Sequence, residues 1–290
     1  MIVDVLVYGF IQSVALILMA FGFSLVYGVS RLPNFAHGAI YVLTGFAAWI
    51  AVNRLGLPYP LAVPAALVFA AGVGVGIYQL VLRRVRGMEV SEVIATYAIG
   101  LAILEGLRWA GFRGSARSLP PWSDGVVFLF DVPVDHHRAL MVVVGFAMMG
   151  ALWLFTRYTR IGLALKGIAQ DERAAMMLGI DSDLTATVAV ALGSALAGLG
   201  ALLLLPLGSI VVEEGYKVLI YAIAVCVVGG LGSWAGTVAA SFVLGYSQYA
   251  TVAYGKPHYQ MVVMLLAIIV TLVLRPSGFF GKQKQLEERV

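Results

Sequence analysis

Asn34, His37, Tyr41 and Thr44 are polar side chains spaced three or four residues apart in otherwise apolar sequence. In a helix, this spacing places Asn34 with Tyr41, and His37 with Tyr41 and Thr44, on one face. Amide, imidazole and hydroxyl groups donate and accept hydrogen bonds, so such a face can hold backbone groups or line the path of a polar solute. Tyr27, near the end of the preceding apolar stretch, completes this candidate set for a translocation path. Tyr41 and Thr44 are equally compatible with simple packing.

These side chains surround an interruption, RLPNFAHG at 31–38, of sequence that carries no formal charge over 5–30. A backbone break inside a bilayer persists only where protein or water satisfies its N–H and C=O groups. One interpretation is a tight cytoplasmic turn with Arg31 at the headgroups and Asn34 capping the next helix. The other is a broken helix in which Asn34 and His37 hold backbone at the cytoplasmic side of a solute path. A metal site at His37 is not favoured, because the other histidines fall in loops expected outside.

The composition excludes an ordinary soluble domain. The chain of 290 residues is 61% hydrophobic and 12% charged, with a mean hydropathy of +0.94, whereas soluble domains are about half apolar and about a quarter charged. A membrane-spanning helix needs about 20 apolar residues. We therefore expect one all-α membrane domain over 1–290, a polytopic bundle of about eight to ten transmembrane segments. Nine apolar stretches stand out: 5–29, 35–52, 60–82, 92–110, 139–155, 185–206, 218–232, 236–253 and 258–274. The break between the seventh and eighth leaves open a re-entrant segment within 218–253.

Small residues indicate how these helices pack. Gly72 and Gly76 are four residues apart, and Gly193, Ala197 and Ala201 repeat the same spacing. Because lipid provides no hydrophobic drive for helices to associate, small residues that let backbones approach closely mark packing faces. Both faces are predicted to point at other helices.

The basic residues predict the orientation, since short cytoplasmic loops collect Lys and Arg. Assigning loops to alternate sides places twelve on one side: Arg31, Arg83, Arg84, Arg86, Arg157, Arg160, Lys166, Arg173, Arg275, Lys282, Lys284 and Arg289. The other side has seven: Arg54, Arg108, Arg113, Arg117, Arg138, Lys217 and Lys256. The N-terminus is therefore expected outside and the C-terminus inside. The charges form no basic face with interleaved aromatics, so no nucleic-acid partner is expected.

Two connections are long. The loop 111–138 is rich in Pro, Gly and Asp and is expected to cover the external mouth. The segment 156–184 is the longest polar stretch on the predicted cytoplasmic side. In its centre, Asp171, Glu172 and Arg173 offer charges that can orient a polar interface with a partner. Ala175 and Gly179 are four residues apart and are predicted to form a helix face that a partner's backbone can approach.

No energy source is visible in the chain. It lacks the G-x-x-x-x-G-K-[ST] loop that holds nucleotide phosphates, and one cysteine, Cys226, excludes an intrachain disulfide and a cysteine metal cluster. We expect neither a cofactor nor a metal bound by this chain.

An ion-coupled secondary transporter or channel would favour acidic residues within the spans. Glu105 is the candidate, and Arg108 three residues later predicts an ion pair instead. A membrane-embedded hydrolase is disfavoured because the chain has no H-E-x-x-H, no G-x-S-x-G and no paired intramembrane aspartates.

The stretch GFSLVYGVSRLPNFAHGAIYVLTGF resembles the first two spans of inner-membrane permeases in the branched-chain amino-acid family of ABC importers. The matching residues are Tyr27, Gly28, Asn34, Phe35, Ala36, His37 and Gly38. The likeness continues to LRPSGFFG at 274–281 and so covers nearly the whole chain. Members of this family also carry urea, amides and related small solutes, so the resemblance does not select the solute.

The resemblance implies a multi-pass permease subunit of a bacterial-type inner membrane, without enzymatic activity of its own. It implies two ATP-binding cassette ATPase subunits that use the ATP, an external solute-binding protein, and a homologous second permease or a second copy of this chain. It also implies that 156–184 is the ATPase coupling loop. There RAAMMLG aligns with the family signature Glu-Ala-Ala, three residues, Gly. Ala174, Ala175 and Gly179 fit, while Arg173 takes the place of Glu.

Overall fold

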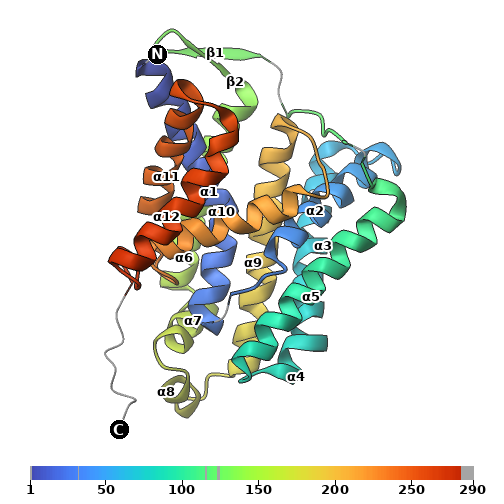
Figure 1. The fold of residues 1–290 in the computed structure, drawn as a ribbon. Helices are drawn as coiled ribbons and strands as arrows, with labels where there is room; N and C mark the ends of the chain where they lie inside the picture. Colours follow the sequence, from blue (N-terminus) through green and yellow to red (C-terminus); the bar gives the residue numbers. More distant parts are fainter. Residues whose placement is uncertain (1, 32, 115, 123–124, 282–290) are drawn as a thin grey trace.

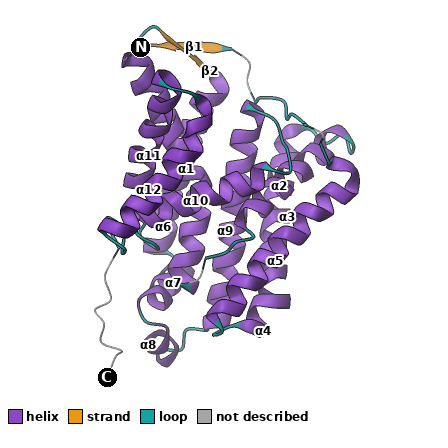
Figure 2. Cartoon of the chain, in the orientation of Figure 1, coloured by secondary structure: helices purple, strands orange, loops and turns teal. Residues whose placement is uncertain are grey.

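The computed structural model describes residues 2–31, 33–114, 116–122 and 125–281 and shows a helical bundle with a small hairpin at one end (Figures 1 and 2). The α-helices are α1 (Ile2–Ser30), α2 (His37–Asn53), α3 (Tyr59–Ile77), α4 (Arg83–Val85), α5 (Glu89–Leu107), α6 (His136–Tyr158), α7 (Arg160–Gln170), α8 (Glu172–Met177), α9 (Ser182–Leu204), α10 (Glu214–Gly229), α11 (Trp234–Tyr254) and α12 (Gln260–Leu274). Short π or 3-10 turns adjoin them: η1 (Tyr78–Leu82), η2 (Arg108–Phe112), η3 (Leu205–Leu207) and η4 (Pro257–Tyr259).

All nine predicted apolar stretches form helices, so the polytopic helical bundle is confirmed. Within the described residues, six helical stretches are long and apolar enough to cross a membrane, and α10 with α11 can make a seventh as a bent pair. This is fewer than the eight to ten spans expected. The difference arises because α2 has only 17 residues and because α10 and α11 meet at an angle of 114°.

Glycines produce the sharp bend between α10 and α11. Gly230 and Gly232 have φ angles of 100° and 78°, a region that L residues with a side chain rarely adopt. Gly229 and Gly236 approach so closely across the turn that a Cβ on either would collide with the carbonyl of the other. The predicted break at this position is therefore confirmed.

Helices α1 and α9 lie at the centre of the bundle. Helix α1 packs against α9, α10 and α11, and α9 also packs against α2 and α3. The face of α9 formed by Gly193, Ala197 and Ala201 is a packing face, as predicted. Both alanines are fully buried, and Gly193 lies against α1. Gly72 and Gly76 do not pack against another helix of this chain, because an added Cβ at either would meet no atom within 4 Å. That face of α3 points away from the rest of the chain.

The bundle has two distinct ends (Figure 1). Helices α4, α7 and α8 lie at the lower end, while the hairpin lies at the upper end beside the start of α1. The three helices at the lower end, α4, α7 and α8, carry five of the twelve basic residues that the sequence assigned to one side: Arg83, Arg84, Arg160, Lys166 and Arg173. Lys282, Lys284 and Arg289 lie outside the described residues.

The predicted external loop contains the only strands in the described part of the chain. Strand β1 (Val126–Leu129) pairs antiparallel with β2 (Val132–Asp135). Before the hairpin, Arg117 exchanges backbone hydrogen bonds of 3.1 and 2.6 Å with Ile210. The loop is thus fixed against the connection between α9 and α10.

Candidate functional site

The helix break, described at residues 31 and 33–36, enters the interior of the bundle. His37, the first residue of α2, is 1% exposed, and its Nε2 donates to the carbonyl of Met19 at 2.8 Å. Its ring also lies edge-on to Phe23, with 5.8 Å between centroids. Met19 is far from the end of α1 at Ser30, and a helix rises about 1.5 Å per residue, so His37 lies roughly 16 Å from that end. The break is therefore not a tight turn at the membrane surface.

Asn34 organises this non-helical segment. Its side chain is buried, and its Oδ1 accepts a hydrogen bond from the backbone N–H of Ala36 at 3.0 Å. Its carbonyl accepts from the N–H of His37 at 3.2 Å. The residue at the cap of α2 is Ala36, not Asn34; Asn34 instead makes the short-range bond typical of Asx turns.

Two cavities lie on either side of this region. The lower cavity, of about 540 Å³, is lined by residues of the break, the start of α5, the elbow described below and the start of α9, among them Arg31, Asn34, Tyr78, Arg86, Glu92 and Glu172. The upper cavity, of about 330 Å³, is lined by α1, α2, α10 and their neighbours, among them Gln12, Met19, Tyr41, Arg138, Glu214 and Lys217.

A closely packed layer, which we call the partition, separates the cavities. A Cβ on Gly22 of α1 would collide with the carbonyl of Gly193 in α9 and lie 3.0 Å from Cε1 of His37. A Cβ on Gly200 would lie 3.1 Å from the carbonyl of Leu18. The two central helices therefore touch backbone to backbone, with the His37 ring against the contact.

The five candidate path residues are distributed over this arrangement. Asn34 lines the lower cavity and Tyr41 lines the upper one, while His37 is part of the partition. Thr44 is fully buried, and its Oγ1 donates to a carbonyl within α2. Tyr27 lies beside Gly232, at the bend between α10 and α11. Asn34, His37 and Tyr41 thus lie at the lower cavity, the partition and the upper cavity, and the other two residues lie in helix contacts.

The predicted coupling loop forms two short helices, α7 and α8, joined by a single residue, Asp171. We call these three parts the elbow. The side chain of Asp171 caps α8 by accepting from the N–H of Ala174 at 3.0 Å. The prediction that Ala175 and Gly179 share an open helix face is wrong. Ala175 is buried against α7 and α9, and Gly179 lies beyond the end of α8 with φ +85°.

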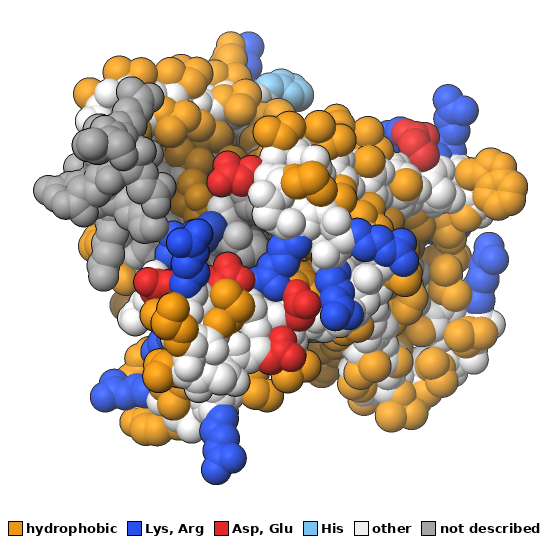
Figure 3. All heavy atoms as spheres, turned by 90° about the horizontal axis from the view of Figure 1, so that it is seen from below, with side chains coloured by type: hydrophobic (Ala, Val, Ile, Leu, Met, Phe, Trp, Pro, Cys, Tyr) orange, Lys and Arg blue, Asp and Glu red, His pale blue; other side chains and the backbone are white. Residues whose placement is uncertain are grey.

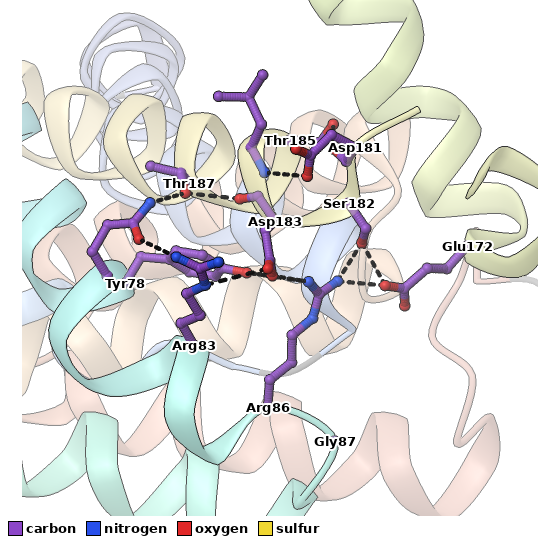
Figure 4. Close-up of polar contacts among 12 residues, drawn as sticks. Tyr78, Arg83, Arg86, Gly87, Glu172, Asp181, Ser182, Asp183, Thr185 and Thr187 are labelled. Carbon is purple, nitrogen blue, oxygen red and sulfur yellow. Dashed lines mark hydrogen bonds and ion pairs between the residues drawn. The ribbon is translucent and has the colours of Figure 1, made fainter. Parts of the chain in front are cut away.

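An arginine absent from the sequence-based site holds the elbow in place (Figure 4). Arg86, which follows α4, forms ion pairs with Glu172 in α8 and, at 2.5 Å, with Asp183 at the start of α9. Tyr78 also donates to Asp183 at 3.0 Å. Partial burial opposes the charge, but the Tyr78 hydroxyl and the two carboxylates raise the pKa of the Arg86 guanidinium. From the sequence, Arg86 was only one of the twelve basic residues used to predict the membrane orientation, because its ion-pair partners are distant along the chain.

Seen from the lower end, acidic and basic side chains gather on one surface (Figure 3). Arg83 adds a further ion pair to Asp183 at 3.3 Å. At the other end, the predicted pair of Glu105 and Arg108 is confirmed. Arg108 also reaches Glu213 at 3.1 Å, so Glu105 is part of a charge cluster and not an isolated acid.

Comparison with known proteins decides the family. The family described as "Branched-chain amino acid transport system / permease component" matches residues 5–272. The chain belongs to this family. The permease is 29% identical to the high-affinity branched-chain amino acid transport system permease protein LivH of Escherichia coli K12, covering 91% of each chain. It is 28% identical to BraD, the corresponding permease protein of Pseudomonas aeruginosa, covering 96% of this chain and 95% of the relative.

A solved structure shares the fold. PsaBC from Streptococcus pneumoniae in complex with Fab superposes with a TM-score of 0.56 at 14% identity, covering 95% of the permease and 94% of that chain. The membership and the apolar spans make this protein a multi-pass inner-membrane permease component of an ABC importer, as the residues of the break had indicated.

Proposed function

We propose that this permease imports an amino acid by opening its upper and lower cavities in turn. The observation that carries the proposal is the partition: the His37–Met19 hydrogen bond and the α1–α9 contact separate two cavities that both have polar side chains in their walls. Rocking of helices about a fixed site is how many transporters alternate access. The cavity residues of one chain would form their share of a path completed by a second permease, either a homologue or a second copy.

The lower end is assigned to the cytoplasm, with the N-terminus outside. The elbow supports this assignment because Met177 at its tip and Leu178 just beyond it are 87% and 84% exposed. Exposed apolar side chains on a polar segment mark an interaction surface. Two ATPase subunits would receive these tips and use the ATP, while an external solute-binding protein delivers cargo at the upper end.

The upper cavity fits a zwitterionic amino acid. Glu214 offers a carboxylate for an ammonium group, and Lys217 and Arg138 offer cations for a carboxylate. Ile11 and Met19 add apolar wall beside them. The carboxylate of Glu214 is 3.2 Å from Nζ of Lys217. Branched-chain amino acids, named for LivH and BraD, are the first solutes to test.

The test is purification of the tagged permease in mild detergent, identification of its partners by mass spectrometry, and reconstitution of the complex in vesicles. We expect to recover ATPases and a second permease. Leucine uptake should require ATP and the external receptor, and ionophores should not change it. A stable complex without ATPases whose uptake follows an ion gradient would refute the proposal and favour a secondary transporter.

A further inference from the structure

Arg31 connects the helix break to the elbow. Its Nη2 donates to the carbonyls of Ala169 and Gln170, at 3.2 and 2.9 Å. These are the last carbonyls of α7, which have no partner within an α-helix and lie at the negative end of its dipole. A guanidinium therefore meets both the hydrogen-bonding need and the charge of this helix end.

The backbone of Arg31 is held in an unusual conformation. Its φ is +57°, in the left-handed region that a residue with a side chain rarely adopts. Its own N–H donates to the carbonyl of Tyr27 at 2.8 Å, closing the end of α1. This turn directs the chain from α1 toward the partition while its side chain reaches α7.

The rest of the break is firmly attached at its inner end. The two hydrogen bonds of Asn34 fix the turn before α2, and His37 attaches it to Met19 in the partition. The segment thus has directional bonds to the elbow at one end and to the partition at the other. The apolar contacts between α7 and α1, such as Leu165 and Ile168 with Val29, are non-directional and permit sliding.

Arg86 holds the opposite side of the same elbow. It pairs with Glu172, the first residue of α8, while Arg31 binds the last residues of α7. Only Asp171 separates the two anchored helix ends. Movement of the elbow therefore acts on the polar contacts of two arginines. Of these two, Arg31 is the one that belongs to the helix break.

We propose that Arg31 is a positioning residue that transmits movement of the elbow to the partition. The inference rests on the proposed function, since it assumes an ATPase that moves the elbow. When α7 tilts, its terminal carbonyls carry the guanidinium with them. The movement passes along the chain to Asn34 and His37, which hold the start of α2, and the His37–Met19 contact changes with it.

The experiment uses the complete importer in vesicles with Cys226, which is buried, replaced by Ala. Ala15, a small residue lining the upper cavity, becomes the reporter as Ala15→Cys. Uptake, ATP hydrolysis and the rate of maleimide labelling are measured with and without ATP. The variants are Arg31→Ala, Arg31→Lys and the matched control Arg84→Ala, which removes an exposed arginine of α4 at the same end.

Arg31→Ala is expected to assemble with the ATPase subunits. Its uptake should fall at least about fivefold, the lower range of typical coupling energies, and the ATP-dependent change in reporter labelling should disappear. Arg31→Lys should recover part of both, because an ammonium keeps the charge but binds two carbonyls less well. Arg84→Ala should match the parent. If Arg31→Ala does not assemble, Arg31→Lys alone decides by the same two readouts.

Unchanged uptake and labelling response in Arg31→Ala, or in Arg31→Lys where only that variant assembles, would overturn the inference. An equal loss in Arg84→Ala would also overturn it, because the effect would then follow from charge alone. Failure of the parent complex to take up solute with ATP is a separate result that rejects the proposed function itself.

Discussion

Replacing His37 by Leu separates a role in transport from a role in folding. Leu has a comparable size but cannot donate to the Met19 carbonyl, so the change removes one hydrogen bond of 2.8 Å. A hydrogen bond contributes about 1 kcal/mol net, and bonds between membrane helices average about 0.6 kcal/mol. The carbonyl of Met19 lies within α1 and keeps its acceptor role in the helix ladder, so no group is left unpaired.

This loss is small against a folding stability of about 5–15 kcal/mol, so His37→Leu should reach normal abundance. The closed partition loses the same roughly 1 kcal/mol, which shifts an equilibrium about fivefold. Solute should leak back, and steady-state accumulation should fall about fivefold while ATP hydrolysis continues.

The assay is accumulation of labelled solute in cells, divided by the amount of permease in the membrane. His37→Gln provides the rescue, since its amide can donate to the same carbonyl. His258→Leu is the matched control, because His258 is exposed in η4. Wild-type accumulation by His37→Leu at normal abundance would refute the role of this bond in the partition, as would a loss equal to that of His258→Leu.

Three further changes test the packing, the elbow and the source of energy. Gly193→Ala should destabilise the purified permease by about 1–3 kcal/mol through overpacking, which a lower melting temperature would show. Gly72→Ala, the control, should not lower the melting temperature. Equal melting temperatures for the two variants would contradict the close α1–α9 contact. Arg86→Ala should speed tryptic cleavage at the elbow, although each partly exposed ion pair contributes at most about 1 kcal/mol. A cleavage rate equal to that of Arg84→Ala would show that Arg86 does not hold the elbow. Glu105→Gln should leave ATP-driven uptake and its indifference to ionophores unchanged; loss of uptake would return the ion-coupled alternative.

The apolar stretches of the sequence determined the helices, and its break motif indicated the family. Both signals are local: about 20 apolar residues suffice to define a span, and the run from Asn34 to Gly38 is contiguous. The ion pair of Glu105 with Arg108 was also predictable, because residues three apart are neighbours on a helix. The same local reasoning overestimated the number of spans, since an angle such as that between α10 and α11 does not appear in hydropathy.

Only the tertiary structure decided which residues meet across the chain. The depth of His37 depends on Met19, and the attachment of the elbow depends on Arg31 and Arg86. Arg31 reaches Gln170 over 139 positions of sequence separation. No helical period or loop spacing encodes such a contact; it exists because close packing of the central helices brings distant segments together, where unpaired carbonyls and carboxylates require donors. The sequence contained the donors, and the packing selected their acceptors.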